Sequence, residues 1–450
     1  MNSKEMKPDL SPLRSVKLLG LFGDRDASID LADHSVTLLF GQNGVGKSTL
    51  LRVVARLLGS QIGSLPQDPI TAARLVFADG ATMGYSAGPP ATWSDRLPDG
   101  SEATGEIADV SALELDPQFR EFIESESPYF FREGKVVSHG GRPLPSPLLE
   151  QLRSTFLRRR SRTQREVSQA APQDGRRLIR QCFLIGSDRL EGRILSGDAR
   201  KGLEAPMRFR YDPDADVAEQ ISQHLIHLIT QARQDALKRS SSLDGSFITR
   251  AVGTLQDSEP LPDVERQALV VRISELQKRL VNCGLASTSL EIPTLGNDSS
   301  EVKKIFDLYL KDLLSKAEAT ESVLPKLELF EEILNSHFTD KVARLQADGG
   351  LIIQRRATGT PVPLERLSSG ERHLVVLFHH LIFRTTPGGL CLIDEPEISL
   401  HVDWQERFIE SIAKVAKVSP QQYVIATHSP SIVGRHESLM RELVAEPVNR

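Results

Sequence analysis

A glycine-rich stretch early in the chain has the residue types and spacing of a phosphate-binding loop. The eight residues from Gly41 to Ser48 read GQNGVGKS, follow an apolar run and precede a segment with helical apolar periodicity. In such a loop the glycines let backbone N–H groups curl around a phosphate, the lysine reaches the terminal phosphates and the serine hydroxyl binds Mg²⁺. The motif therefore predicts binding of ATP and Mg²⁺ through Gly41, Asn43, Gly44, Gly46, Lys47, Ser48 and Thr49.

Two adjacent acidic residues end an apolar strand pattern toward the C-terminus. Residues 390–393, LCLI, predict a buried strand that delivers Asp394 and Glu395 to its carboxyl end, the edge where ligands bind in an open parallel sheet. We expect Asp394 to hold Mg²⁺, through a water or together with Ser48, and Glu395 to polarise the attacking water as a general base. A bare acidic pair could instead be a helix cap or a solvated turn, but the neighbouring motifs favour the metal site.

A histidine and a serine-containing motif complete the set. His428 follows a second strand pattern, QYVIAT, and can reach a γ-phosphate from there, the alternative being a structural histidine. The motif LSSGE, Leu367 to Glu371, opens a predicted helix whose N–H groups and Ser368 hydroxyl form an anion site. We expect Ser368 and Gly370 to meet the γ-phosphate bound by another copy, so that two copies enclose ATP head to tail. A plain capped helix is the competing interpretation.

The elements that would position these motifs alternate between strands and helices. Apolar strand patterns flank the glycine-rich loop, and Asp79-Gly80 predicts a hairpin turn. From residue 216 to 347 apolar residues recur at three- and four-residue spacing, which predicts long helices interrupted at residues 240–246 and 283–298. We predict an N-terminal ATPase lobe with a basic insertion over 1–200, a helical or coiled-coil arm over 201–345, and a C-terminal ATPase lobe over 346–450.

Composition predicts a cytoplasmic globular protein. Of the 450 residues 39% are hydrophobic and 26% are charged, no apolar run approaches the roughly eighteen residues of a membrane span, and the N-terminus lacks a secretory signal. We therefore expect no membrane partner. The net charge of −5 gives no general attraction to nucleic acid, so DNA binding would need a local patch. Cys182, Cys283 and Cys391 lack disulfide or zinc spacing and are expected to be small buried side chains.

Three further features carry weaker signals. The arginine-rich segment from Arg153 to Arg180 could contact a phosphate backbone or an acidic partner, or be a solvated loop. Gln181 is a candidate for the glutamine of a nucleotide-sensing Q-loop, or an ordinary strand-edge residue. His224 and His227 share a helical face but have no further ligands nearby in the sequence, which disfavours metal binding.

In their order along the chain these motifs resemble those of ABC-class ATPases of the SMC and RecF type. The P-loop, LSSGE, LIDEPE, a following Ser399-Leu400-His401 similar to a D-loop, and the histidine of THS carry the resemblance. It covers residues 15–85 and 350–435, and the middle of the chain only in architecture. The resemblance implies an α/β fold, an ABC-type P-loop NTPase head with split lobes and an inserted helical arm, which forms a homodimer or a higher homo-oligomer.

Within that group the chain looks most like ATPase subunits of bacterial anti-phage systems, those of PARIS first and of Septu second. The GLFG start and the run from Glu397 to Gln405 carry this likeness. It implies an ATP-driven switch that controls a separate effector nuclease and responds to DNA or a phage protein. Because few residues follow His428, we expect no nuclease domain in this chain. The alternative is a DNA-repair or recombination ATPase that binds DNA, and a transporter motor fits less well because DEPEISLH departs from the usual DEPTSALD.

Overall fold

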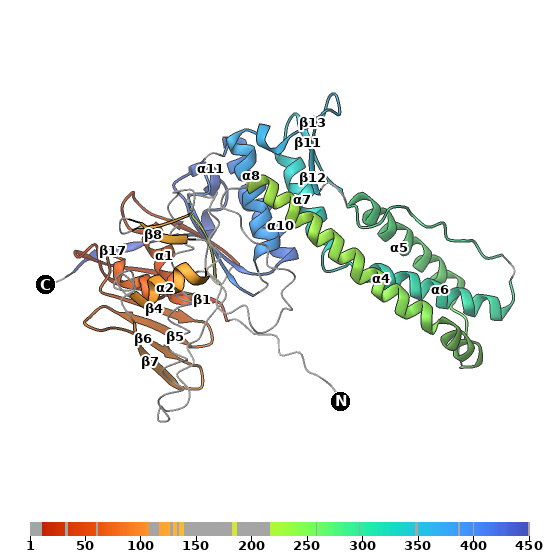
Figure 1. The fold of residues 1–450 in the computed structure, drawn as a ribbon, viewed down its shortest axis with the longest axis horizontal. Helices are drawn as coiled ribbons and strands as arrows, with labels where there is room; N and C mark the ends of the chain where they lie inside the picture. The colour runs from red at the N-terminus through yellow and green to blue at the C-terminus, as the bar shows by residue number, and fades with distance from the viewer. Residues whose placement is uncertain are drawn as a thin grey trace. The chain divides into compact units, whose positions relative to one another are not determined.

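The computed structural model describes most of the chain, namely residues 11–31, 35–59, 62–107, 117–126, 129–132, 135–138, 182–186, 217–257, 259–296, 298–346, 350–385, 388–398 and 400–448. The arginine-rich segment, Gln181 and Ser399 lie outside the described residues. Internal packing divides the chain into two units, a nucleotide unit formed by Met1–Pro206 with Arg384–Arg450 and a helical unit formed by Met207–Phe383 (Figure 1).

A parallel sheet at the centre of the nucleotide unit carries the chemical motifs at its strand ends. In spatial order its strands are β10 (Cys182–Ile185), β14 (Leu390–Asp394), β15 (Gln422–Ala426), β3 (Val36–Phe40) and β16 (Met440–Glu442). Asp394 pairs with Ala426, and Ala426 pairs with Leu39 on the next strand. All five residues of β14 are buried, as the continuous apolar run of a strand covered on both faces predicts.

Helices follow three of these strands, β3, β14 and β15, in the chain. The P-loop leads from β3 into α1 (Lys47–Leu58), which packs against β10, β14 and β15 and buries Leu50, Leu51 and Val54. After β14 come α9 (Val402–Glu406) and α10 (Phe408–Val418), and after β15 comes α11 (Pro430–Val433). Each of these three strand ends therefore leads into a loop and a helix N-terminus, the arrangement that binds phosphates in parallel sheets.

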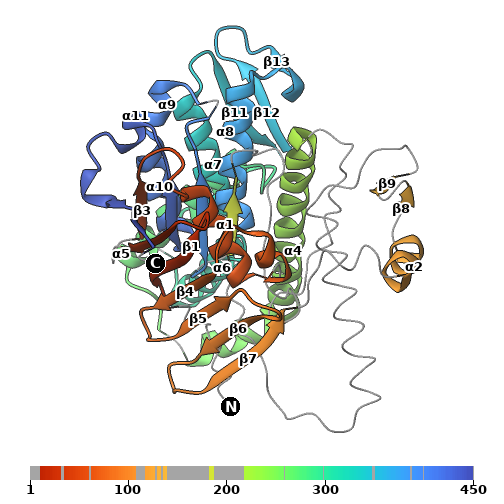
Figure 2. The same cartoon turned by 90° about the vertical axis from the view of Figure 1, so that its left-hand side faces the viewer.

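An antiparallel sheet belongs to the same unit. Its strands, in spatial order, are β17 (Val444–Pro447), β2 (Arg25–Asp30), β1 (Leu13–Leu21), β4 (Ala72–Phe77), β5 (Thr82–Ser86), β6 (Ala91–Arg96) and β7 (Glu102–Ile107). The predicted hairpin at Asp79-Gly80 is confirmed between β4 and β5, and Figure 2 shows β4 to β7 following one another across the sheet. A single apolar cluster joins side chains of this sheet, such as Leu18, with Leu51 of α1 and Leu392 of β14. The unit also contains α2 (Pro117–Glu126) and the hairpin of β8 (Tyr129–Arg132) and β9 (Lys135–Ser138).

The helical unit combines long helices with a small sheet. Its main elements are α4 (Val217–Asp257), α5 (Asp263–Asn282), α6 (Ser300–Glu318), α7 (Leu324–His337), β11 (Lys341–Gln346), β12 (Gly350–Arg355), β13 (Pro361–Val362) and α8 (Ser369–His379). The predicted interruption at residues 283–298 is confirmed between α5 and α6. The predicted interruption at residues 240–246 is wrong, because α4 runs through it as one helix.

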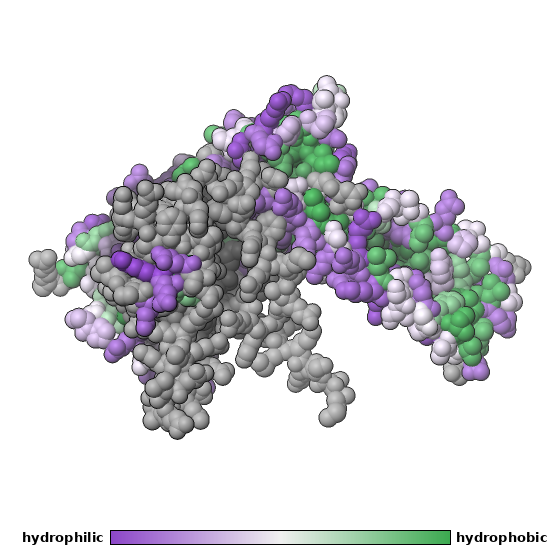
Figure 3. All heavy atoms as spheres, in the orientation of Figure 1, coloured by the Kyte–Doolittle hydropathy of each residue, from purple (hydrophilic) through white to green (hydrophobic). Residues whose placement is uncertain are grey.

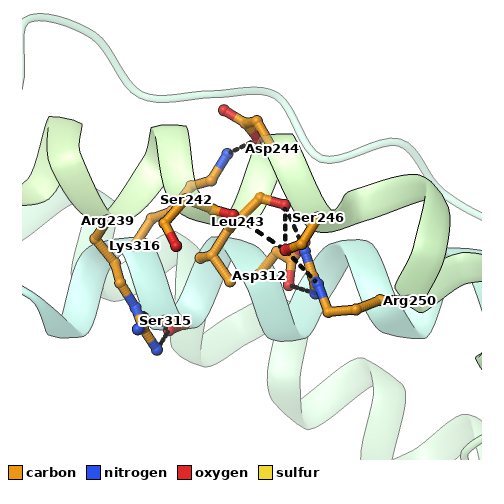
Figure 4. A network of polar contacts seen from close by, with 9 residues as sticks. All are labelled: Arg239, Ser242, Leu243, Asp244, Ser246, Arg250, Asp312, Ser315 and Lys316. Atoms are coloured by element: carbon orange, nitrogen blue, oxygen red, sulfur yellow. Dashed lines mark hydrogen bonds and ion pairs between the residues drawn. The ribbon is translucent and has the colours of Figure 1, made fainter.

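The side-chain hydrogen bonds of the serine-rich stretch are compatible with a continuous helix. Ser246 Oγ donates to the carbonyls of Ser242 and Leu243 one turn earlier, at 3.0 and 3.2 Å (Figure 4). Arg250 Nη2 donates to the same Leu243 carbonyl, at 2.7 Å. Serine side chains that bond back to the preceding turn are compatible with a helix, although they do not favour it intrinsically. The chain turns instead after α4, where Pro260 and Pro262 precede α5.

Ion pairs fix α4 against α6. Arg250 donates from Nη1 and Nη2 to the two carboxylate oxygens of Asp312, at 2.5 and 2.7 Å, and Asp312 is only 6% exposed. Lys316 Nζ donates to Asp244 at 2.7 Å on the same face (Figure 4). A bidentate arginine–carboxylate pair is directional, so it selects one register between the two helices. Figure 3 shows that apolar side chains nevertheless remain exposed on this unit. Ile248 and Val264 are two of its exposed large hydrophobic residues.

Candidate functional site

The P-loop takes the backbone shape that its glycines allow. Gly46 is the N-cap residue of α1 and has φ 106°, and Gly44 has φ 76°, values that side-chain-bearing residues rarely adopt. A Cβ on Gly46 would lie 2.6 Å from Leu21 Cδ2, because the end of β1 packs directly beneath the loop. Both the conformation and the close approach therefore require glycine at position 46. Because Gly46 is the N-cap, the N-terminus of α1 lies directly at the end of the loop.

Lys47 is held at the centre of the loop. Its Nζ donates to the carbonyl of Gly41 at 2.8 Å and to that of Gln42 at 3.2 Å, and it lies 3.4 Å from His428 Nδ1. Only 5% of the residue is exposed. Burial lowers the pKa of Lys47, and the nearby carboxylates of Asp394, Glu395 and Glu397 partly oppose this shift. The lysine is therefore a desolvated cation placed where an anionic phosphate would compensate it.

Ser48 and Asp394 meet as a pair of oxygen donors. Ser48 Oγ donates to Asp394 Oδ1 at 3.1 Å. Burial raises the pKa of Asp394, the Ser48 hydrogen bond opposes the rise, and Glu395 and Glu397 add to it. Oxygens that bind one Mg²⁺ at right angles lie about 3 Å apart, since each metal–oxygen distance is about 2.1 Å. The hydroxyl and the carboxylate therefore fit a Mg²⁺ ion in both chemistry and spacing.

Glu395, the residue directly after β14, has an unusual backbone conformation. Its φ is 48°, in the left-handed region that residues other than glycine seldom occupy, and its N–H donates to the Ala426 carbonyl at 2.9 Å. The bond extends the β14–β15 pairing by one residue. Backbone strain of this kind persists where surrounding contacts hold it, often at functional sites. The sheet thus places a carboxylate-bearing residue at a fixed point directly after Asp394.

The loop after β15 brings His428 to the same place. Because Lys47 Nζ can only donate, His428 Nδ1 must accept in that contact, which puts the ring proton of a neutral imidazole on Nε2. Sequence reasoning missed the support for this loop. Glu397 accepts from the His428 N–H at 2.7 Å and from Thr427 Oγ1 at 2.9 Å, and Ser429 Oγ donates to Gln405 Oε1 at 2.6 Å. A third acid shortly after the strand was the available signal.

Ser368 and Gly370 lie in the helical unit, at the start of α8. Ser368 is the N-cap of α8 and forms a capping box with Glu371, whose N–H donates to Ser368 Oγ at 3.3 Å and whose carboxylate accepts from the Ser368 N–H at 2.8 Å. Lys341 Nζ donates to the other Glu371 oxygen at 2.8 Å. The motif therefore forms a well-anchored helix N-terminus.

Of the two candidate histidines on α4, His224 has a structural contact. His224 Nδ1 lies 2.9 Å from His379 Nε2, a partner on α8 that the sequence pattern did not suggest. In the described part of the chain no group of three or more histidine, cysteine or acidic side chains could hold a metal ion. The three cysteines are free and buried, which confirms that prediction, and burial raises the pKa of Cys283 to about 12.

The fold and the site together define a class. A parallel α/β sheet presents a P-loop, an acidic pair and a histidine at neighbouring strand ends, and a helical unit is inserted between the two segments that form the sheet. This is an α/β P-loop nucleotide-binding fold, in agreement with the α/β class that the sequence predicts. None of the helices that the structure describes is long and apolar enough to cross a membrane.

Comparisons with known proteins agree with this class. The family model for the AAA ATPase domain matches residues 265–433, and the model for ABC transporters matches residues 25–81. A chromosome partition protein Smc from Rhodopseudomonas palustris is 30% identical over 101 residues, which are 22% of this chain and 9% of that protein. The chain thus spans less than a tenth of the length of this curated relative.

Solved structures of Smc heads also align with the chain. The Smc head domain with an extended coiled coil from Pyrococcus furiosus, bound to the C-terminal domain of ScpA, covers 97% of this chain and 96% of its own, with a TM-score of 0.34 and 13% identity. The SMC head domain from Thermotoga maritima covers 97% of this chain and 99% of its own, with a TM-score of 0.32 and 13% identity.

Proposed function

We propose that this chain is an ATP-binding and ATP-hydrolysing switch. The observation that carries the proposal is the convergence of Lys47, the Ser48–Asp394 pair and His428 at the ends of the adjacent strands β3, β14 and β15. A desolvated lysine and a helix N-terminus bind phosphates, and a hydroxyl with a carboxylate binds Mg²⁺. Mg²⁺ would neutralise charge on the phosphates when bound.

Each residue then has a distinct role. Lys47 binds the β- and γ-phosphates, and Asp394 holds Mg²⁺ with Ser48. Glu395, fixed immediately beyond Asp394, accepts a proton from the attacking water, and His428 donates from Nε2 to the γ-phosphate. Positioning and electrostatics supply most of the rate in phosphoryl transfer, so a rigid sheet edge suits the reaction.

The second half of the site comes from another copy. Ser368 and Gly370 form a helix N-terminus that is suited to an anion, as the LSSGE motif of ABC-class ATPases does. Two copies related by a two-fold axis would each present this motif to the other's γ-phosphate. ATP binding would close the dimer and hydrolysis would open it. The rate of hydrolysis would then set how long the dimer stays closed, and the chain would act as a switch and not as a source of mechanical power.

The output of the switch is proposed from resemblance alone. The likeness to anti-phage ATPases favours control of a separate effector nuclease, triggered by DNA or a phage protein. The second candidate is a DNA-repair or recombination ATPase, a class suggested by the local identity to a chromosome partition protein over 22% of this chain. DNA that stimulates hydrolysis through the arginine-rich segment, Arg153 to Arg180, would support the second candidate. Co-purification with a nuclease encoded beside this gene would support the first.

Subunit complementation tests the shared site. Lys47→Ala removes the phosphate-binding cation, and Ser368→Asp keeps a good N-cap while placing negative charge at the anion site. Each variant alone is expected to be inactive, and Ser368→Asp monomers should bind ATP with unchanged affinity. In a 1:1 mixture half of the dimers carry both defects in one site and leave the other intact, so about a quarter of the wild-type turnover should return. A mixture that remains inactive, with mixed dimers demonstrated, would refute the shared site.

A further inference from the structure

Residues 427–429, which we call the histidine loop, are joined to the segment after β14 by a continuous set of hydrogen bonds. Glu397 Oε1 accepts from the His428 N–H at 2.7 Å, and Glu397 Oε2 accepts from Thr427 Oγ1 at 2.9 Å. Gln405, at the end of α9, extends the set: its Oε1 accepts from Ser429 Oγ at 2.6 Å, and its Nε2 donates to the Leu400 carbonyl at 2.9 Å. Three consecutive residues of the histidine loop therefore depend on two side chains from the other segment.

The strand register makes this contact possible. Asp394 pairs with Ala426, so the chains that leave β14 and β15 start at the same level of the sheet. The Glu395 N–H, bonded to the Ala426 carbonyl at 2.9 Å, keeps them together for one more residue. Glu397 then lies beside residues 427 and 428. A hydrogen bond from a backbone N–H to a carboxylate is strong and directional. This contact therefore fixes the His428 backbone, from which the imidazole side chain extends.

We propose that Glu397 and Gln405 are positioning residues, which hold His428 so that its Nδ1 accepts from Lys47 and its Nε2 proton faces the terminal phosphate. The proposal rests on the function proposed above and assigns a task to the third acid of the site. It also separates the acids by role. Both Glu397 oxygens accept from donors of the histidine loop, which assigns this carboxylate to holding the loop.

The chemistry of the contact allows a selective test. In Glu397→Gln the amide oxygen can accept from the His428 N–H, and the amide nitrogen can donate to Thr427 Oγ1, since a hydroxyl both donates and accepts. Glu397→Ala removes both contacts. We expect kcat within about fivefold of wild type for Glu397→Gln, and a fall of about tenfold to a hundredfold for Glu397→Ala with little change in KM. A kcat lost in Glu397→Gln as fully as in Glu395→Gln would make Glu397 a base and overturn the proposal.

A double-mutant cycle tests whether Glu397 acts through His428. His428→Ala alone should lower kcat, and adding Glu397→Ala should cause little further loss because the residue to be positioned is gone. Losses that multiply would show an independent role and contradict the proposal. Glu331→Ala is the matched control, since Glu331 also accepts from a backbone N–H, that of Leu345 at 3.2 Å, but lies in the helical unit. It should leave kcat unchanged.

Nitrogen NMR of ¹⁵N-histidine-labelled protein gives a readout that does not depend on turnover. The His428 signals, assigned by their loss in His428→Ala, should report a ring protonated at Nε2 in the wild type and in Glu397→Gln. Glu397→Ala should show a mixture of tautomers or broadened signals. If the wild type hydrolyses no ATP but Glu397→Ala still perturbs the ring, the proposed ATPase function fails and the positioning role stands. An unperturbed ring in Glu397→Ala would refute the positioning role whatever the turnover.

Discussion

Replacing Gly46 by alanine tests how the antiparallel sheet supports the P-loop. The new Cβ would lie 2.6 Å from Leu21 Cδ2, and Leu21 is fully buried, so the leucine has little room to move. Alanine at φ 106° also costs roughly 1–2 kcal/mol in backbone strain. Overpacking of a core adds about 1–3 kcal/mol. We therefore expect Gly46→Ala to lose about 2–5 kcal/mol of stability, a large part of what a typical domain has.

Two comparisons separate the strain from the clash. Gly44→Ala has a similar strained φ of 76° but its Cβ would meet nothing within 4 Å, so it should lose only the strain contribution. In a cycle with Leu21→Ala, the Gly46→Ala loss should shrink, because the clashing methyl is removed. Differential scanning fluorimetry without nucleotide measures the loss of stability in each variant. Titration with a fluorescent ATP analogue measures the loss of nucleotide affinity that displacement of the loop causes. Equal losses for Gly46→Ala and Gly44→Ala, or full additivity with Leu21→Ala, would refute the contact.

Two predictions concern the acidic pair. Glu395→Gln should keep its affinity for ATP, accumulate the closed dimer and lower turnover by about a hundredfold or more. Single-turnover hydrolysis measures the rate, and analytical ultracentrifugation detects the dimer. Unchanged turnover would exclude Glu395 as the base. Asp394→Asn should raise the melting temperature of the nucleotide-free protein at pH 7 and abolish the extra stabilisation by Mg²⁺ with ATP. Burial raises the pKa of Asp394, so the ionised carboxylate lowers the stability of the wild type at a pH above its folded-state pKa. The difference in melting temperature between Asp394→Asn and the wild type should therefore shrink as the pH falls through that folded-state pKa. A pH-independent difference in melting temperature would contradict this origin.

The parts of the site that sequence identified are those in which one short segment supplies the chemistry. The P-loop, Asp394 with Glu395, and His428 each follow an apolar strand, so each could be placed at a strand end without knowledge of the neighbours. The contact between Glu397 and residues 427 and 428 depends on a strand register that periodicity does not encode. The continuity of α4 through residues 240–246 depends likewise on Arg250, whose contacts compensate for weak local helix propensity.

The electrostatics of the P-loop region explain why binding of phosphate and Mg²⁺ should stabilise this fold. Lys47 and Asp394 carry opposite charges, yet desolvation is the largest cause of the shift in each, lowering the pKa of the lysine and raising that of the acid. Their mutual attraction therefore does not fully offset the cost of burying them. A phosphate beside Lys47 and a cation beside Asp394 would each supply the missing compensation. Under the proposed function, the stability lost to burial of these charges would be recovered as binding free energy, and nucleotide would control how firmly the strand-end loops are held.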